Sequence, residues 1–460
     1  MRRAPRARVE VAAALVALAT ARGAAQDSAA TPATGFDVQW GVEAKAHARS
    51  SERHRFASPF PFTPDQLPPG QSRAFLETVD GGDHLELSTL TLFVEAARGP
   101  RLAARAKLDL IDLYDRNPTS TDREIDLDEA WVRFGSESEP AILPDQRGAY
   151  LRIGKFAKFE RQDDRHLESY GLSATAFNRF EDAGVEVGLD FGRHVYLRGS
   201  VTQGNPVFLR DPNALAGDNG TPERRRARPD NVPERGSGIV ILYDAEVEDL
   251  DFHEVELGAG LGVRAGDGAG RWALDLLAWG YRRELAERLT LEGTFYGGDL
   301  DLLDGPELPP PYPRASLPIS GRDKQELGAN AWLYRGGFSF FGQYVDQEIA
   351  GLDRRGYEGE AAWRIELPLV WAVGGRQLLP ALAPAVRYSK LEPGIEGGGP
   401  FPAPSVRWEW EKWDLGLRLS IVSGADLTLE YASHRFFIPS LGAHHSNDEL
   451  LGTLRWKMGS

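Results

Sequence analysis

The chain ends in the stretch DELLGTLRWKMGS, residues 448–460. From Leu450 to Met458 every second residue is apolar or glycine, and the positions between them include Arg455 and Lys457. Strict alternation of this kind predicts a β-strand with one apolar face and one polar face. A strand also needs a hydrogen-bonding neighbour on each side. Its place at the end of the chain therefore raises the question of what pairs with it.

The same alternation recurs along most of the 460 residues, in stretches of about ten residues separated by turns. One of them, RLAARAKLDL at residues 101–110, sets alanine and leucine against Arg105, Lys107 and Asp109. No amphipathic helix of useful length competes with this pattern. We predict strands at residues 36–48, 84–97, 101–114, 124–135, 148–160, 180–191, 194–204, 237–246, 252–264, 270–282, 286–297, 325–335, 337–348, 355–367, 378–391, 411–422, 424–435 and 447–458.

The connections between these strands mostly alternate between short and long. Gly99-Pro100 and Gly336-Gly337 are tight turns, whereas residues 49–83, 205–236 and 298–324 form long connections. This sorting is typical of outer-membrane barrels, which have short periplasmic turns and long extracellular loops. We therefore predict an all-β fold, a transmembrane antiparallel up-and-down β-barrel of eighteen strands, with sixteen as the alternative.

A barrel answers the question that the last strand raises. In lipid every backbone donor and acceptor must pair within the protein, so an open sheet edge is not viable. The first and last strands must then pair with each other. We predict that GFDVQWGVEAK, residues 35–45, is the partner of residues 448–458, with Leu454, Trp456 and Met458 facing lipid. The last strand also fits a terminal signal read by the barrel-assembly machinery.

The amino terminus predicts export. Residues 1–25 combine arginines, an apolar run at 11–20 and small residues before Gln26, as in a secretory signal peptide. A short periplasmic segment at 26–35 and the barrel at 36–458 would follow. Removing residues 1–25 would lower the net charge from −15 to −19, because five Arg and one Glu are lost. So acidic an exported protein is a poor candidate for binding nucleic acid.

Other totals narrow the choices further. The chain has no cysteine, which excludes disulfides, thiolate metal sites and a lipoprotein anchor. It has no run of eighteen apolar residues after the signal peptide, so no helical span is expected. The predicted location is the outer membrane of a Gram-negative bacterium, with lipid and lipopolysaccharide as surroundings.

Residues 127–160 carry a family resemblance. LDEAWVRFG places Asp128, Glu129, Ala130 and Trp131 at the end of one strand, and YLRIGKFAKFERQDD then supplies Arg152, Gly154, Lys155 and Lys158. This pair of strands resembles the phosphate-selective porin O/P family. The resemblance implies an outer-membrane porin barrel, often of sixteen strands and assembled as a trimer.

If the apolar faces point to lipid, the opposite faces line the pore. The predicted basic lining residues are Lys45, Arg105, Lys107, Arg152, Lys155, Lys158, Arg198, Arg387, Arg418, Arg455 and Lys457. The predicted acidic ones are Glu254, Glu256, Asp275, Glu358, Glu360 and Glu366. Their order along the chain suggests one basic wall opposite an acidic wall, which would create a field across the pore. The alternative is that charges of both signs pair along adjacent strands.

Two loops stand out. Residues 160–180 are mixed in charge and moderately apolar, so they are the candidate for a constriction loop folded into the barrel, with Arg161, Asp163, Asp164 and Arg165 as its charged residues. The arginines of residues 205–236 suit either lipopolysaccharide phosphates or a solvated loop.

The leading functional hypothesis is passive diffusion of small hydrophilic solutes or ions, anions such as phosphate included. Phosphate selectivity would need an unbroken Lys/Arg ladder, which Asp109 and Glu129 interrupt. A non-conducting structural, adhesin or binding barrel is the alternative. We expect no enzyme, cofactor or metal, because the cluster of Asp163, Asp164 and His166 is weak evidence for catalysis.

Overall fold

The computed structural model describes residues 36–52, 55–57, 75–77, 82–111, 125–137, 148–162, 165–177, 181–204, 207–210, 239–240, 244–247, 255–267, 271–285, 288–292, 298–301, 320–368, 371–373, 376–395, 408–438 and 442–459. The chain divides into two compact units, Met1–Asp37 and Val38–Ser460, and the fold below is that of the second. The predicted signal peptide and periplasmic segment lie outside the described residues. No helix in the described ranges is long and apolar enough to cross a membrane.

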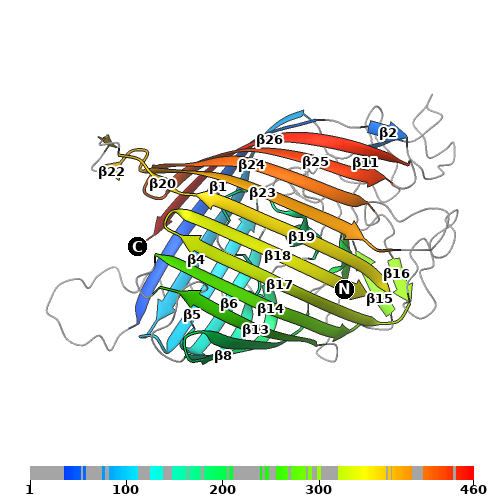
Figure 1. Cartoon of the computed structure of the whole chain (residues 1–460), viewed down its shortest axis with the longest axis horizontal. Helices are drawn as coiled ribbons and strands as arrows, with labels where there is room; N and C mark the ends of the chain where they lie inside the picture. Colours follow the sequence, from blue (N-terminus) through cyan, green and yellow to red (C-terminus); the bar gives the residue numbers. More distant parts are fainter. Residues whose placement is uncertain are drawn as a thin grey trace, which may run out of the picture. The chain divides into compact units, whose positions relative to one another are not determined.

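Long antiparallel strands lie side by side around one closed sheet (Figure 1). The main sheet has 17 strands, of which sixteen form the closed wall and β20 (Ile365–Glu366) continues the end of β19. The wall strands are β1 (Asp37–Ser51), β4 (Gly82–Ala97), β5 (Leu102–Ile111), β6 (Ile125–Gly135), β7 (Ala149–Ala157), β8 (Glu181–Phe191), β9 (Val195–Thr202), β13 (Glu256–Gly266), β14 (Trp272–Glu284), β17 (Asp323–Arg335), β18 (Phe338–Ile349), β19 (Leu352–Trp363), β23 (Ala381–Pro393), β24 (Glu409–Val422), β25 (Ala425–Ile438) and β26 (Ala443–Gly459).

The last strand does close the barrel. β26 pairs antiparallel with β25 on one side and with β1 on the other, and β1 in turn pairs with β4. The β1–β26 register sets Ala44 opposite Trp456 and Lys45 opposite Arg455. The predicted pairing of the first and last strands is thus confirmed, although it involves residues 41–51 where 35–45 were predicted. The terminal strand has neighbours on both sides.

The strand number is sixteen, so the prediction of eighteen is wrong and its alternative is confirmed. The two surplus predictions fall at 237–246 and 286–297. In place of the first, β9 pairs directly with β13 in the wall. The second region holds β15 (Arg288–Glu292), which belongs to a separate four-stranded sheet with β10 (Val207–Arg210), β12 (Asp244–Val247) and β16 (Gly298–Asp301). Alternation predicts a strand, but it does not say which sheet the strand joins.

The remaining described strands are short. β2 (Arg55–Ala57) pairs with β3 (Phe75–Glu77), which also pairs with β11 (Ile239–Val240). β21 (Ala372–Val373) pairs with β22 (Arg376–Gln377).

The two faces of the wall differ as the alternation predicts. On β26, Leu450, Leu454, Trp456 and Met458 are exposed on the outer face. Glu449 and Thr453, at alternate positions of the strand, are buried on the inner face. The same apolar outer face continues on neighbouring strands, with exposed side chains that include Val185, Leu189, Leu261, Leu276, Leu327, Leu415 and Leu429. An apolar exterior around a charged interior is the pattern of a barrel that spans lipid.

Candidate functional site in the barrel interior

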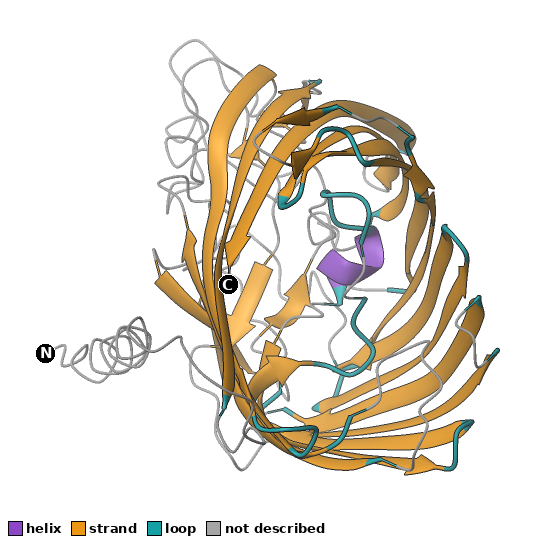
Figure 2. Ribbon diagram, turned by 90° about the vertical axis from the view of Figure 1, so that its left-hand side faces the viewer, coloured by secondary structure: helices purple, strands orange, loops and turns teal. Residues whose placement is uncertain are grey.

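Part of the connection between β7 and β8 lies inside the ring of strands. We call residues 160–162 and 165–177 the lumen loop. It includes the short helix α2 (Leu172–Ala176), which Figure 2 shows within the ring. Four of the five helical residues, among them Leu172 and Ala176, are buried. The segment matches the predicted constriction loop in position, whereas its effect on solute passage stays a prediction.

Ser169 fixes the lumen loop to three wall strands. Its hydroxyl group contacts Glu430 of β25 and lies 2.7 Å from an Nη2 of Arg387 on β23. The backbone oxygen of Ser169 accepts a second hydrogen bond from Arg387 at 2.8 Å. Arg387 also pairs with Asp414 of β24 at 2.9 Å, and Lys412 pairs with Asp414 at 3.0 Å. All of these side chains are buried, so each charge has its partner without access to bulk water.

The helix is anchored next to this cluster. The backbone N–H of Leu172 donates to Ser389 at 3.2 Å, and the backbone N–H of Ser173 donates to Glu358 at 3.2 Å. At the other end of the helix, Arg354 donates to the carbonyl oxygen of Ala176 at 2.9 Å. These bonds satisfy polar groups that a helix end leaves unpaired.

Glycines in the wall make room for the apolar side of the lumen loop. A Cβ at Gly356 would collide with the ring of Phe177, and a Cβ at Gly416 would collide with the side chain of Leu167. Side chains at these wall positions would therefore force Phe177 and Leu167 of the loop to shift. We call β18, β19, β23, β24 and β25 the docked wall, because these strands carry most of the loop's anchoring contacts.

Glu168 links the docked wall to the first strand. It pairs with Lys45 of β1 at 3.1 Å and with Arg418 of β24 at 2.8 Å. Burial alone would raise the pKa of Glu168, but Lys45 and Arg418 lower it to about 2. The carboxylate therefore stays ionised, and the loop stays tied to both strands, well below neutral pH.

The opposite side of the interior is more accessible. We call β4, β5 and β6 the open wall. Arg105 there has 33% of its side chain exposed, Lys107 has 23% and Glu95 has 45%. Arg387, Lys412 and Asp414 of the docked wall, by contrast, are fully buried. The charges of the open wall are thus more accessible than the Arg387, Lys412 and Asp414 cluster of the docked wall.

Most of the predicted lining residues do point into the interior, where they contact other interior groups. Their part in a pore stays a prediction. They are Lys45, Arg105, Lys107, Arg152, Lys158, Arg198, Arg387, Arg418, Arg455 and Lys457 among the basic residues, and Glu256, Asp275, Glu358 and Glu360 among the acidic ones. Arg161 and Arg165 lie in the lumen loop, whereas Glu254, Asp163 and Asp164 lie outside the described residues.

Two residues that were predicted to line the pore, Lys155 and Glu366, do not face the interior. Lys155 pairs in register with Ala130, shares the outer face with the exposed Ile153, and donates to the carbonyl oxygen of Leu127 at 2.6 Å. Alternation from Arg152 likewise puts Lys155 on the outer face. Glu366 lies in β20, beyond the end of β19, with 69% of its side chain exposed and an ion pair to Arg364.

The prediction of one basic and one acidic wall is also wrong. Glu186 and Asp190 sit on the supposedly basic side, next to Arg152 and Arg198 respectively. Arg264 on the supposedly acidic side pairs with Asp275 at 3.0 Å. Lys158 and Lys324 share Glu256 between them. Charges of both signs therefore pair across adjacent strands, because isolated buried charges would be costly.

The most important anchoring residues were missed by sequence reasoning. Lys412, Asp414 and Glu430 fall on polar positions of alternating strands, so alternation alone could have placed them in the interior. Ser169 carries no comparable signal. Its partner Arg387 is 218 residues away in the sequence, and only the closed fold brings the two together.

One acidic group in the described residues has the spacing of a metal site. Ligand oxygens of Asp128, Glu129 and Glu181 lie within 4.8 Å of one another. Each of these carboxylates already has a cationic partner: Lys107 for Asp128, Arg105 for Glu129 and Arg161 for Glu181. We therefore assign no metal to this group.

No protein-family model and no curated protein matches the chain. Among solved structures, the outer membrane channel DcaP of Acinetobacter baumannii is similar at a TM-score of 0.47 and 8% identity, over 94% of this chain and all of that one. OprB of Pseudomonas putida has a TM-score of 0.46, with 9% identity over 93% of this chain and 94% of that one. The anion-selective porin from Comamonas acidovorans has a TM-score of 0.45, with 10% identity over 92% of this chain and all of that one. Such likeness concerns the fold alone, so function must be argued from the interior of this barrel.

Proposed function

We propose that the chain forms a water-filled channel across the outer membrane, through which small hydrophilic solutes diffuse passively. The observation that carries this proposal is the unequal exposure of the interior. The lumen loop packs against the docked wall and leaves the charged side chains of the open wall accessible, with 33% of Arg105 exposed. Solutes pass between the lumen loop and the open wall.

The charges along this path favour charged or dipolar solutes over one selected anion. Arg105, Lys107 and Arg133 alternate there with Asp109 and Glu129. Rings of lining charge set ion preference in such channels. A phosphate-selective path would need cations without this acidic interruption, since Arg and Lys clamp phosphate oxygens. We therefore propose a general channel for small charged and zwitterionic solutes.

The channel is tested by single-channel recording of the purified chain in a planar bilayer. Discrete open-channel currents are expected. Their complete absence would overturn the proposal and favour the alternative, a non-conducting binding or structural barrel. The fully buried cluster around Ser169 and Arg387 is the observation that favours this alternative.

Cysteine substitution tests the route. The chain has no cysteine, so a single introduced thiol is the only target for a charged methanethiosulfonate reagent. Arg105→Cys on the open wall should react and lose a measurable part of its conductance. Ser389→Cys on the docked wall is the matched control, because Ser389 is fully buried and should not react. Equal effects at both positions would place the path elsewhere.

A further inference from the structure

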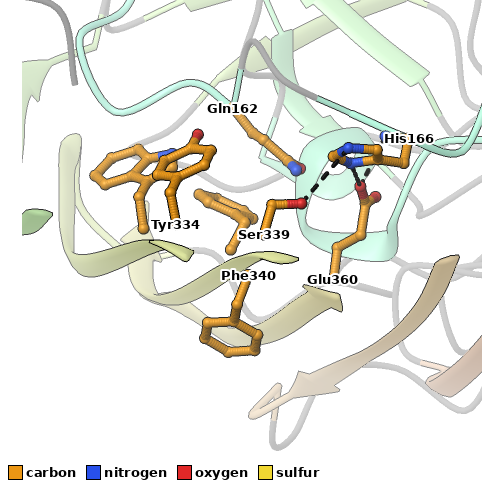
Figure 3. A pocket seen from close by; sticks show the side chains of 8 residues that line it. Gln162, His166, Tyr334, Ser339, Phe340 and Glu360 are labelled. Atoms are coloured by element: carbon orange, nitrogen blue, oxygen red, sulfur yellow. Dashed lines mark hydrogen bonds and ion pairs between the residues drawn. The ribbon is translucent and has the colours of Figure 1, made fainter. Parts of the chain in front are cut away.

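A serine, a histidine and a glutamate from three segments meet at the inner surface of the barrel (Figure 3). Ser339 is on β18, Glu360 is on β19 and His166 is in the lumen loop. The Ser339 hydroxyl oxygen lies 3.5 Å from Nε2 of His166. Nδ1 of the same ring lies 3.2 Å from Oε1 of Glu360. The two ring nitrogens thus face a hydroxyl group on one side and a carboxylate on the other.

The three side chains differ in exposure: the acid is buried, whereas the histidine and the serine are accessible. The Glu360 side chain is 2% exposed, the His166 side chain is 18% exposed, and Ser339 is partly exposed. Glu360 Oε1 also accepts the backbone N–H of His166 at 2.8 Å, which fixes the histidine in place. A buried carboxylate that orients the imidazole beside an accessible hydroxyl is the arrangement of a Ser-His-acid triad. A 3.5 Å separation between hydroxyl and imidazole is within the range found before substrate binds.

Ser339 and His166 are both partly exposed to the barrel interior. Ser339 follows the tight turn at Gly336-Gly337, so it lies near the short-turn end of the barrel wall. A cavity of about 10 Å³, the room of roughly one water molecule, adjoins the triad. Trp332, Tyr334 and Phe341 line it together with Gln162. The side chain of Gln162 points toward Ser339 and His166 in Figure 3.

We propose that Ser339, His166 and Glu360 form a hydrolytic site for small carboxylic esters. Ser339 attacks the carbonyl carbon while His166 Nε2 takes its proton, and the amide of Gln162 stabilises the oxyanion. The intermediate expels the alcohol, which leaves with the proton from His166. Water then attacks the acyl-serine, again with His166 as the base, and releases the carboxylic acid and free Ser339. Ester and water thus become alcohol and acid.

The test uses the full chain in detergent micelles, with p-nitrophenyl acetate as the substrate and a fluorophosphonate as the covalent probe. The unmodified chain should release p-nitrophenol and take up the probe. Ser339→Ala should abolish labelling and lower the rate at least about a hundredfold. Glu360→Gln should keep the serine but lower kcat far more than it changes KM, because the imidazole loses its orienting carboxylate.

Ser200→Ala, which removes another interior serine, is the matched control and should behave as the unmodified chain. Circular dichroism and heat-shifted gel mobility check that each variant folds. If Ser339→Ala does not fold, His166→Asn serves as the second inactivating variant. The proposal would be overturned if labelling persists in Ser339→Ala. It would also be overturned if the folded unmodified chain neither reacts with the probe nor hydrolyses the ester. His166 and Glu360 would then only tether the lumen loop. Neither result depends on whether the barrel conducts.

Discussion

The docked wall and the open wall of the same barrel use the same residue types in opposite ways. On the docked wall, Arg387 and Lys412 are fully buried and bind the lumen loop and its acidic neighbours. On the open wall, Arg105 and Lys107 pair with carboxylates that are themselves partly exposed. A buried charge that loses its partner is costly, whereas an exposed pair contributes little to stability.

In the proposed channel, this contrast would separate structure from conduction within one sheet. Charges of the docked wall hold the lumen loop in place. Charges of the open wall would face the path and act on the solutes. Substitutions on the docked wall should therefore change stability first, and substitutions on the open wall should change ion preference first.

The largest effect is expected for Arg387→Met. This change leaves Asp414, Glu360 and Glu430 buried with fewer cationic partners and removes two hydrogen bonds to Ser169. The free energy of unfolding should fall by about 3–5 kcal/mol. Denaturant unfolding in micelles, followed by tryptophan fluorescence, measures it.

Arg105→Met is the matched control, because it also removes one interior arginine. Its partners, Glu95 and Glu129, keep contact with water, so the loss should stay below about 1 kcal/mol. Similar losses for the two variants would contradict the distinction between the walls.

A smaller effect is expected for Ser169→Ala. The change removes a hydroxyl group that contacts Glu430, Arg387 and Lys412, which remain buried. A loss of about 1–3 kcal/mol is expected, since each of these buried polar groups loses one hydrogen-bond partner. Single-channel conductance should also rise, because the lumen loop is held less firmly against the docked wall. Unchanged conductance together with lower stability would show that the loop does not limit the path.

The faces of the wall strands could be predicted from the sequence, but the contacts inside the barrel could not. Alternation placed Leu454, Trp456 and Met458 on the outer face, because a two-residue period records the side chain's face. The need to close the sheet in lipid identified the pairing of the last strand with the first. Alternation from Arg152 also places Lys155 on the outer face, so the prediction of Lys155 as a lining residue contradicts the alternation.

The site could be predicted only in outline. The mixed charge of residues 160–180 pointed to an interior loop, but its contacts join residues far apart in the sequence. His166 and Glu360 are 194 residues apart, and neither carries a local signal of the other. Strands at 237–246 and 286–297 could not be assigned to a sheet either, since pairing partners depend on the closed topology.

The smallest change in stability, and the clearest change in selectivity, is expected when Arg105 is replaced by Glu. The reversed charge lies on the open wall beside Glu95 and Glu129, so the path gains negative potential. The reversal potential in a salt gradient should shift toward cation preference, while the unfolding free energy changes by less than about 1 kcal/mol. Arg355→Glu is the matched control, because Arg355 is paired with Asp346, its side chain is 59% exposed, and it alternates with the inward-facing Arg354 on β19. It should leave the reversal potential unchanged, since it faces away from the interior. A shift of equal size in both variants would mean that net charge, and not the open wall, sets the ion preference.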